Sequence, residues 1–156
     1  MKAEFIAPAS LLNDRDVETR AFGYKNYSIG PHFHEFYEMN IVLEGTGIHK
    51  IEKSSVYVKK GDVFMIPPNN VHAYNNTGGL EVYHILFSKK MINDNEEVAK
   101  KIPGFLQFVE IEPFLRQHIS DDCFLHLSPS QLSEIKAEFH FIEDKGRFDT
   151  KELLPI

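Results

Sequence analysis

The stretch "GPHFHEFYEMNIVLEG", residues 30–45, places two histidines and a glutamate in a segment with the composition of a β-strand. In a strand, side chains two residues apart point to the same face. The residues predicted to share one face are His32, His34, Glu38 and Asn40. Imidazole and carboxylate groups on one face of a strand are candidate metal ligands.

A second stretch, "GDVFMIPPNNVHAYNN" at residues 61–76, adds His72, with Tyr74 on the same face. If this strand lies beside the first, three imidazoles and one carboxylate surround a single point. This donor set suits a divalent transition ion (zinc, nickel, manganese or iron) with positions left open for water or a ligand. The predicted metal ligands are His32, His34, Glu38 and His72; the same residues, with Asn40 and Tyr74, are the predicted ligand-binding set.

Short β-rich segments recur between turn signals from Tyr24 to about Ser88. The turn signals include Gly45 to Gly47 and Gly78-Gly79. Seven or so short strands at this spacing predict a mainly β fold, an antiparallel sandwich or barrel of the jelly-roll group.

Helical patterns appear after the β-rich region. Residues 89–101 are polar enough for an exposed helical turn or loop, whereas "FLQFVEIE", residues 105–112, has strand character. Ser128, Pro129 and Gln131 form a helix start with a capping box, and this helix is predicted to run to about Gly146.

The predicted final helix carries an apolar stripe with spacings of three and four residues. Its members are Leu132, Ile135, Phe139 and Ile142. We expect the stripe to pack on the sheet of the same chain; the alternative is a share of a dimer interface. A second capping-box pattern begins at Asp149, and the end at "KELLPI" suggests a longer protein cut within a helix.

The two stretches resemble the two signature motifs of the cupin superfamily. The first family motif reads His, one residue, His, three or four residues, Glu, six residues, Gly, and its members here are His32, His34, Glu38 and Gly45. The second is matched by Gly61, Pro67, His72 and Asn76, with Asn69 standing where glycine is usual. The resemblance implies a cupin β-barrel, which is a double-stranded β-helix, followed here by C-terminal helices.

Three longer segments point to one family within the cupin superfamily. "HFHEFYEMNIVLEGTGIHKIE", "VKKGDVFMIPPNNVHAY" and "VYHILFS" resemble the N-terminal effector-binding and dimerisation domain of AraC-type bacterial transcription regulators. The resemblance implies an arm at 1–20, an effector-binding barrel at 21–127 and a helical dimerisation or linker segment at 128–156. It also implies a small-molecule effector, often a sugar, a homodimer, no enzyme activity, and DNA binding only through a helix-turn-helix domain beyond these residues.

The same residues are compatible with other functions. The histidines could line an organic effector pocket without any ion, although a buried carboxylate such as Glu38 is costly without a positive partner. A small metal-dependent cupin enzyme, an isomerase or a dioxygenase, would use the same four residues, and a binding or storage cupin is a third reading. His84 is predicted to be a core or surface residue, and no site role is predicted for His49, His118, His126 and His140.

Composition limits the other function classes. The chain has 156 residues and a net charge of −6, without a basic stripe to hold a nucleic acid duplex. No apolar run approaches the roughly 20 residues of a membrane span, the start does not resemble a signal peptide, and Cys123 is the only cysteine. These features predict a cytoplasmic protein that contacts no membrane. No nucleophilic catalytic site is predicted, because the sequence has no serine in a nucleophile elbow and no phosphate-binding glycine loop.

Overall fold

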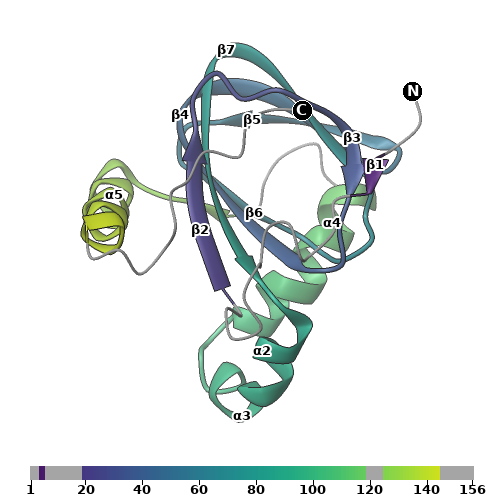
Figure 1. Cartoon of the computed structure of the whole chain (residues 1–156), viewed down its shortest axis with the longest axis vertical. Helices are drawn as coiled ribbons and strands as arrows, with labels where there is room; N and C mark the ends of the chain where they lie inside the picture. The colour runs from purple at the N-terminus through teal and green to yellow at the C-terminus, as the bar shows by residue number, and fades with distance from the viewer. Residues whose placement is uncertain (1–3, 6–18, 119–124, 145–156) are drawn as a thin grey trace.

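The computed structural model describes residues 4–5, 19–118 and 125–144. In this part of the chain the strands curve around a common interior, and helices lie at one end and along one outer side (Figure 1). The strands are β1 (Glu4–Phe5), β2 (Thr19–Tyr24), β3 (Ile29–Phe33), β4 (Tyr37–Ile51), β5 (Ser54–Lys59), β6 (Asp62–Ile66), β7 (His72–Phe87) and β8 (Leu125–His126). The helices are α2 (Lys89–Asp94), α3 (Glu96–Ala99), the π-helical turn η1 (Gln107–Ile111), α4 (Glu112–His118) and α5 (Pro129–Asp144).

Two long strands organise the sheet. β4 and β7 pair antiparallel along their whole length, from Tyr37 opposite Phe87 to Ile51 opposite His72. The early part of β4 also pairs with β6 and its later part with β5, while β7 pairs first with β3 and then with β2. The prediction of a mainly β barrel followed by helices is confirmed.

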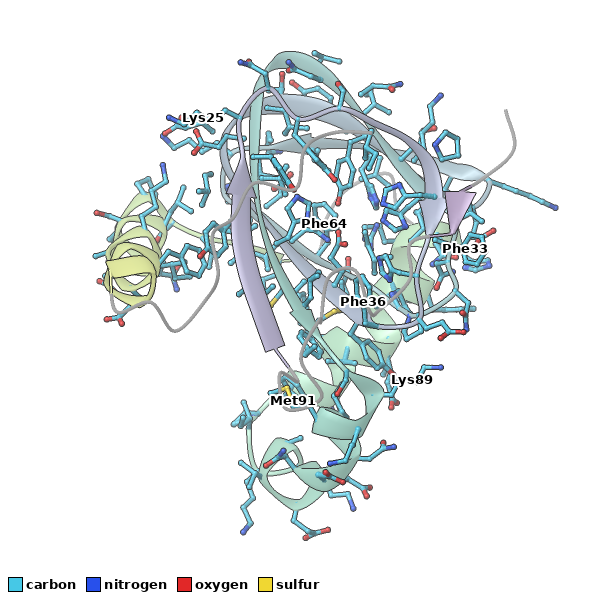
Figure 2. All side chains as sticks on the ribbon, viewed as in Figure 1. Lys25, Phe33, Phe36, Phe64, Lys89 and Met91 are labelled. Carbon is cyan, nitrogen blue, oxygen red and sulfur yellow. The ribbon has the colours of Figure 1, made fainter. Side chains whose placement is uncertain are left out.

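Apolar side chains from strands β4 to β7 form a buried cluster in the barrel interior. This cluster comprises Val42, Ile51, Val56, Val58, Phe64, Ile66, Tyr74, Leu80 and Val82. Figure 2 shows Phe64 within the ring of strands. Alternation along β6 directs the next residue, Met65, outward, where it packs with Phe87 and Val109 beneath the helices.

Helix α5 begins as the sequence predicts. The backbone N–H of Ser128 donates to Gln131 Oε1 at 2.9 Å, and the N–H of Gln131 donates to Ser128 Oγ at 3.4 Å, which is a capping box. The apolar side of the helix packs on the outside of the sheet, where Phe139 stacks on Tyr83 with ring centroids 3.7 Å apart. Packing on the same chain is therefore confirmed for Leu132 and Phe139, which are both buried.

The strand predicted at residues 105–112 is wrong. This segment leads into and forms the π-helical turn η1, followed directly by α4. The spacing of its larger side chains fits one side of a helix, with Phe105, Phe108, Val109 and Glu112 separated by three, one and three residues. The first three of these side chains pack under the barrel. The polar segment before it forms the short helices α2 and α3, as predicted.

Two sequence predictions fall wholly or mainly outside the described residues. The second capping box at Asp149 is not among them, and of the predicted arm only Glu4–Phe5 and the first residues of β2 are described. The pair Glu4–Phe5 runs parallel to β3, with Glu4 opposite His32 and Phe5 opposite Phe33. The division at residues 20 and 127 stays a prediction.

Gly45 marks the bend of β4 and gives a testable consequence. It has a φ of +72°, and a Cβ there would collide with the carbonyl oxygens of Gly78 and Gly79 on β7. We expect Gly45→Ala to lower the free energy of unfolding by about 1–3 kcal/mol from backbone strain alone, measured by urea denaturation. The control Gly30→Ala, where a Cβ meets no described atom within 4 Å, should change little; equal stability of the two variants would contradict this account of the bend.

Candidate metal and effector site

The two histidine motifs meet inside the barrel. His32 lies on β3 opposite His72, the first residue of β7, and His34 follows β3 in the turn that leads to β4. The prediction that the residues of the first motif share one strand is therefore wrong, because the chain turns between Phe33 and Tyr37. The backbone N–H of Asn69 donates to the carbonyl oxygen of His34 at 2.7 Å, which ties the second motif to the first. Asn69 has a φ of +68°, a conformation that asparagine tolerates better than most residues, so it can stand where the family usually has glycine.

Three of the predicted ligands converge on one point. His34, Glu38 and His72 each offer a ligand atom, and these atoms all lie within 4.8 Å of one another. All three side chains are buried, with exposed fractions of 1%, 6% and 1%. His32 lies beside them, its ring centroid 4.0 Å from that of His72, but it is not part of this cluster.

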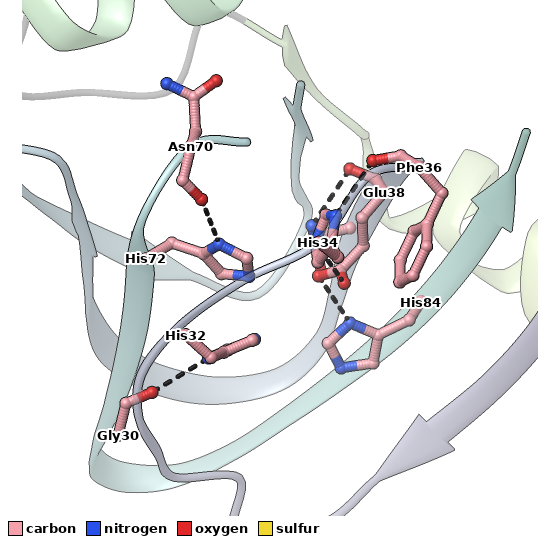
Figure 3. Close-up of polar contacts among 9 residues, drawn as sticks. Gly30, His32, His34, Phe36, Glu38, Asn70, His72 and His84 are labelled. Carbon is pink, nitrogen blue, oxygen red and sulfur yellow. Dashed lines mark hydrogen bonds and ion pairs between the residues drawn. The ribbon is translucent and has the colours of Figure 1, made fainter. Parts of the chain in front are cut away.

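Backbone carbonyls fix the hydrogen positions on all three motif histidines (Figure 3). His32 Nδ1 lies 2.9 Å from the carbonyl oxygen of Gly30, His34 Nδ1 2.9 Å from that of Phe36, and His72 Nδ1 3.0 Å from that of Asn70. A carbonyl oxygen only accepts, so each Nδ1 must donate, and in the neutral ring Nε2 carries a lone pair. This is the arrangement that prepares an imidazole to bind a metal through Nε2.

The carboxylate of Glu38 is held by two imidazoles. His84 Nδ1 lies 3.1 Å from Oε1, and His34 Nε2 lies 3.3 Å from Oε2. Burial alone would raise the pKa of Glu38, but His84 and His34 outweigh it and hold this pKa well below the usual range. The site therefore contains an ionised carboxylate.

The contact between His34 and Glu38 needs a positive charge. If the His34 ring is neutral, the lone pair on Nε2 faces a carboxylate oxygen, and two electron-rich atoms at this distance repel each other unless a proton or a cation lies between them. His72 Nε2 is buried with no hydrogen-bond partner in the described part of the chain. Such unpaired buried polar atoms are costly, so the donor set fits a cation.

The other predicted site residues also face the interior. Asn40 is fully buried, donates through Nδ2 to the carbonyl oxygen of Glu38 at 3.3 Å, and has no partner for Oδ1 among the described residues. Tyr74 is buried, and its ring lies 4.7 Å from that of His49. Both can therefore line a site shared with the histidine cluster.

Two residues given no site role from the sequence stand at the cluster. His84 is 1% exposed and orients Glu38, and His49 is fully buried against Tyr74 and Phe64. Their placement depends on the pairing of β4 with β7, where His49 lies opposite Tyr74 and Asn40 opposite His84. Strand parity could have found His84, which lies an even number of residues from His72 on β7. It could not have found His49, which lies an odd number of residues from Glu38 and faces the interior only because the β4 ladder shifts register between Val42 and Gly47.

The neutral histidines predict an acid-sensitive fold. Burial, with His32 nearby, lowers the pKa of His72 to about 3, and burial with Arg116 nearby lowers the pKa of His49 well below 6.5. The unfolded chain binds these protons near pH 6.5 and the folded chain does not, so stability is complete above that pH and is lost as the pH falls towards 3. In urea denaturation with EDTA present, we expect a constant midpoint from pH 8 to 7 and a steep fall below 6.5.

Replacement of His72 by phenylalanine should flatten the acid-dependent fall in stability. A protein that keeps the same urea midpoint from pH 7 to pH 4.5 would contradict the buried neutral state of these rings.

The family model described as the AraC-like ligand binding domain matches residues 16–127. The chain belongs to the AraC-like ligand binding domain family. This confirms the resemblance to AraC-type regulators. The HTH-type transcriptional activator RhaR of Salmonella paratyphi B is 27% identical over 93 residues, which are 60% of this chain and 33% of that protein.

The AraC-like domain thus spans about a third of the length of the curated relatives it matches. Among solved structures, a predicted oxalate decarboxylase from Thermotoga maritima is 31% identical, with a TM-score of 0.38 over 39% of this chain and 56% of that one. A cupin protein from Bacteroides fragilis is 16% identical, with a TM-score of 0.40 over 46% and 64% of the two chains. Within its described residues, the AraC-like domain has no helix long and apolar enough to cross a membrane.

Proposed function

We propose that this chain is the effector-sensing domain of an AraC-type transcription regulator, and that a small molecule binds inside its barrel. The observation that supports this most strongly is the group of buried polar atoms around His34, Glu38 and His72. The contact of His34 Nε2 with Glu38 Oε2 needs a positive charge, and His72 Nε2 lacks a partner among the described residues. A barrel that served only as a scaffold would gain stability from apolar residues at these positions.

The donor set fits a divalent transition ion such as zinc, nickel, manganese or iron. His34, Glu38 and His72 would hold it, and His32 stands close enough to join as a fourth ligand after a small ring movement. The ion would supply open coordination positions for an oxygen or nitrogen atom of the effector. Asn40 and Tyr74 would add hydrogen bonds to the bound molecule.

The partners of the whole protein are part of the same proposal. The regulator would act as a homodimer in the cytoplasm and bind DNA through a helix-turn-helix domain encoded after these residues, because the net charge of −6 does not favour DNA binding by this chain itself. The position of the arm would depend on whether the site is occupied, because Glu4 of β1 pairs with His32 of β3, a residue of the first motif. Deletion of residues 1–20 should then change effector affinity or response, and an unchanged response would exclude the arm from the mechanism.

A metal-dependent cupin enzyme, an isomerase or a dioxygenase, is the second candidate. The same cluster supports it, because a transition ion with open positions can activate a bound substrate. The two candidates differ in what happens to the small molecule: a sensor releases it unchanged, and an enzyme does not.

The test uses the full-length protein encoded by the gene. A panel of sugars and sugar acids is screened for compounds that change its affinity for its own upstream DNA, and each active compound is followed by NMR for conversion. We expect a compound that shifts DNA affinity and is recovered unchanged, with His72→Ala still binding DNA but no longer responding. A full-length protein that does not bind DNA, or that converts the compound, would overturn the sensor proposal.

A further inference from the structure

A further histidine, His49 on β4, lies inside the barrel and belongs to neither cupin motif. It is fully buried, and its ring centroid lies 4.8 Å from that of Phe64, 4.7 Å from that of Tyr74 and 6.1 Å from that of His72. His49 therefore shares the interior with the candidate metal cluster. Its Nδ1 contacts an arginine side chain, whereas Nδ1 of each motif histidine contacts a backbone carbonyl oxygen.

Arg116 fixes the hydrogen position on His49. This arginine of α4 is fully buried and reaches under the barrel, where Nε contacts Glu112 Oε1 at 2.7 Å and Nη2 donates to the carbonyl oxygen of Met65 at 2.5 Å. Its Nη1 lies 3.2 Å from His49 Nδ1. A guanidinium only donates, so His49 Nδ1 must accept, and the ring hydrogen must sit on Nε2.

The result is a buried donor without an acceptor. His49 Nε2 has no hydrogen-bond partner in the part of the chain that the structure describes. An N–H left unpaired in the interior costs about 1–3 kcal/mol, and it is a group that a ligand can satisfy. His72 differs from His49, because its Nδ1 donates to the carbonyl oxygen of Asn70 and its neutral ring presents a bare lone pair on Nε2.

The charge behind His49 favours an oxygen acceptor. Burial and the nearby Arg116 lower the pKa of His49 well below 6.5, so the ring stays neutral and keeps this single donor. The guanidinium also polarises the ring through the Nδ1 contact, which strengthens the hydrogen bond that Nε2–H can donate.

We propose that His49 recognises the effector by donating from Nε2 to one of its oxygen atoms, and that Arg116 is the positioning residue that sets this tautomer. The inference rests on the proposed function and names the chemistry of the ligand. A small hydroxylated or carboxylated molecule can place one oxygen at the cluster of His34, Glu38 and His72 and a second at His49, because the rings of His49 and His72 are 6.1 Å apart.

The first test reads the tautomer directly in metal-free protein. Long-range ¹H–¹⁵N NMR of the histidine rings should show His49 with a protonated Nε2 and a bare Nδ1, and His32, His34 and His72 with Nδ1 protonated. Titration with formate, a carboxylate probe, or acetamide, a neutral carbonyl probe, should then give a saturable shift of the His49 Nε2 signal. Binding of one probe and not the other tells which kind of oxygen the site prefers.

Two variants separate recognition from folding. His49→Asn keeps an acceptor near the Nδ1 position for Arg116 but has no donor at the Nε2 position, whereas His49→Gln can place an amide N–H there. We expect His49→Asn to weaken binding of the active probe roughly 10- to 100-fold and His49→Gln to retain most of it, with native ¹H–¹⁵N spectra for both. A His49 ring protonated on Nδ1, or a wild-type signal that neither probe moves, overturns the inference.

Failure of the two proposals can be told apart. If the probes bind through His49 but the full-length protein shows no effector response, the sensor proposal fails and the recognition site stands. If the full-length protein responds to an effector equally well with His49→Asn, the role of His49 fails and the sensor proposal stands.

Discussion

Replacement of Arg116 by methionine is expected to lower the free energy of unfolding by about 3–5 kcal/mol, the range for breaking a buried ion pair from one side. Arg116 is fully buried and Glu112 is 5% exposed, so the variant leaves a carboxylate inside the protein without its partner. The variant also removes the hydrogen bond to Met65 and the contact over the ring of Phe64, where the guanidinium carbon lies 4.9 Å from the centroid. Urea denaturation at pH 7 measures the loss.

Two controls make the Arg116 result specific. Lys100→Met breaks an ion pair with Glu96 at the same i, i+4 spacing, but on the exposed surface, so it should change stability little. The double variant Arg116→Met with Glu112→Leu removes both charges and should recover much of the loss, since a buried pair can often be replaced by apolar groups. If Arg116→Met is as stable as Lys100→Met, the network does not hold α4 to the barrel.

Replacement of His72 by alanine is expected to weaken zinc binding by more than about 100-fold. Loss of a group that only orients a ligand already costs about 10- to 100-fold in metal affinity, and His72 would supply a ligand atom itself. Competition with a chromophoric chelator measures the affinity in protein prepared without a histidine tag.

The matched control for His72 is His118→Ala. His118 is an exposed histidine whose Nδ1 contacts the carbonyl oxygen of Phe114 in its own helix, far from the motifs in sequence. Its loss should leave zinc affinity unchanged. Equal affinities of the wild type and His72→Ala would show that any bound ion lies elsewhere on the protein.

Much of the fold could be predicted from local features of the sequence. The burial of His32, His34, Glu38 and Asn40 was predicted correctly, but strand parity explains it only for Glu38 and Asn40, which share β4. The capping box at Ser128 and Gln131 and the apolar stripe of the last helix were also predictable, since both depend on residues within a few positions of one another.

The contacts that could not be predicted from the sequence depend on pairing between distant segments of the chain. His84 meets Glu38 because β7 lies beside β4, and the two residues are 46 positions apart. Arg116 meets His49 across 67 positions, and its segment follows residues 105–112, whose aromatic and β-branched residues imitate a strand. Contacts between residues so far apart in sequence leave no short motif. The tautomer of His49 therefore could not be predicted from the sequence and follows only from the folded structure.

The most direct test of the account is an anomalous difference map from crystals of the tag-free protein grown after incubation with zinc. We predict one strong peak per chain inside the barrel, bonded to His34 Nε2, His72 Nε2 and the carboxylate of Glu38. Peaks confined to the surface, or no peak near these three residues in well-ordered crystals, would contradict the central claim that the cluster is a metal-binding effector site.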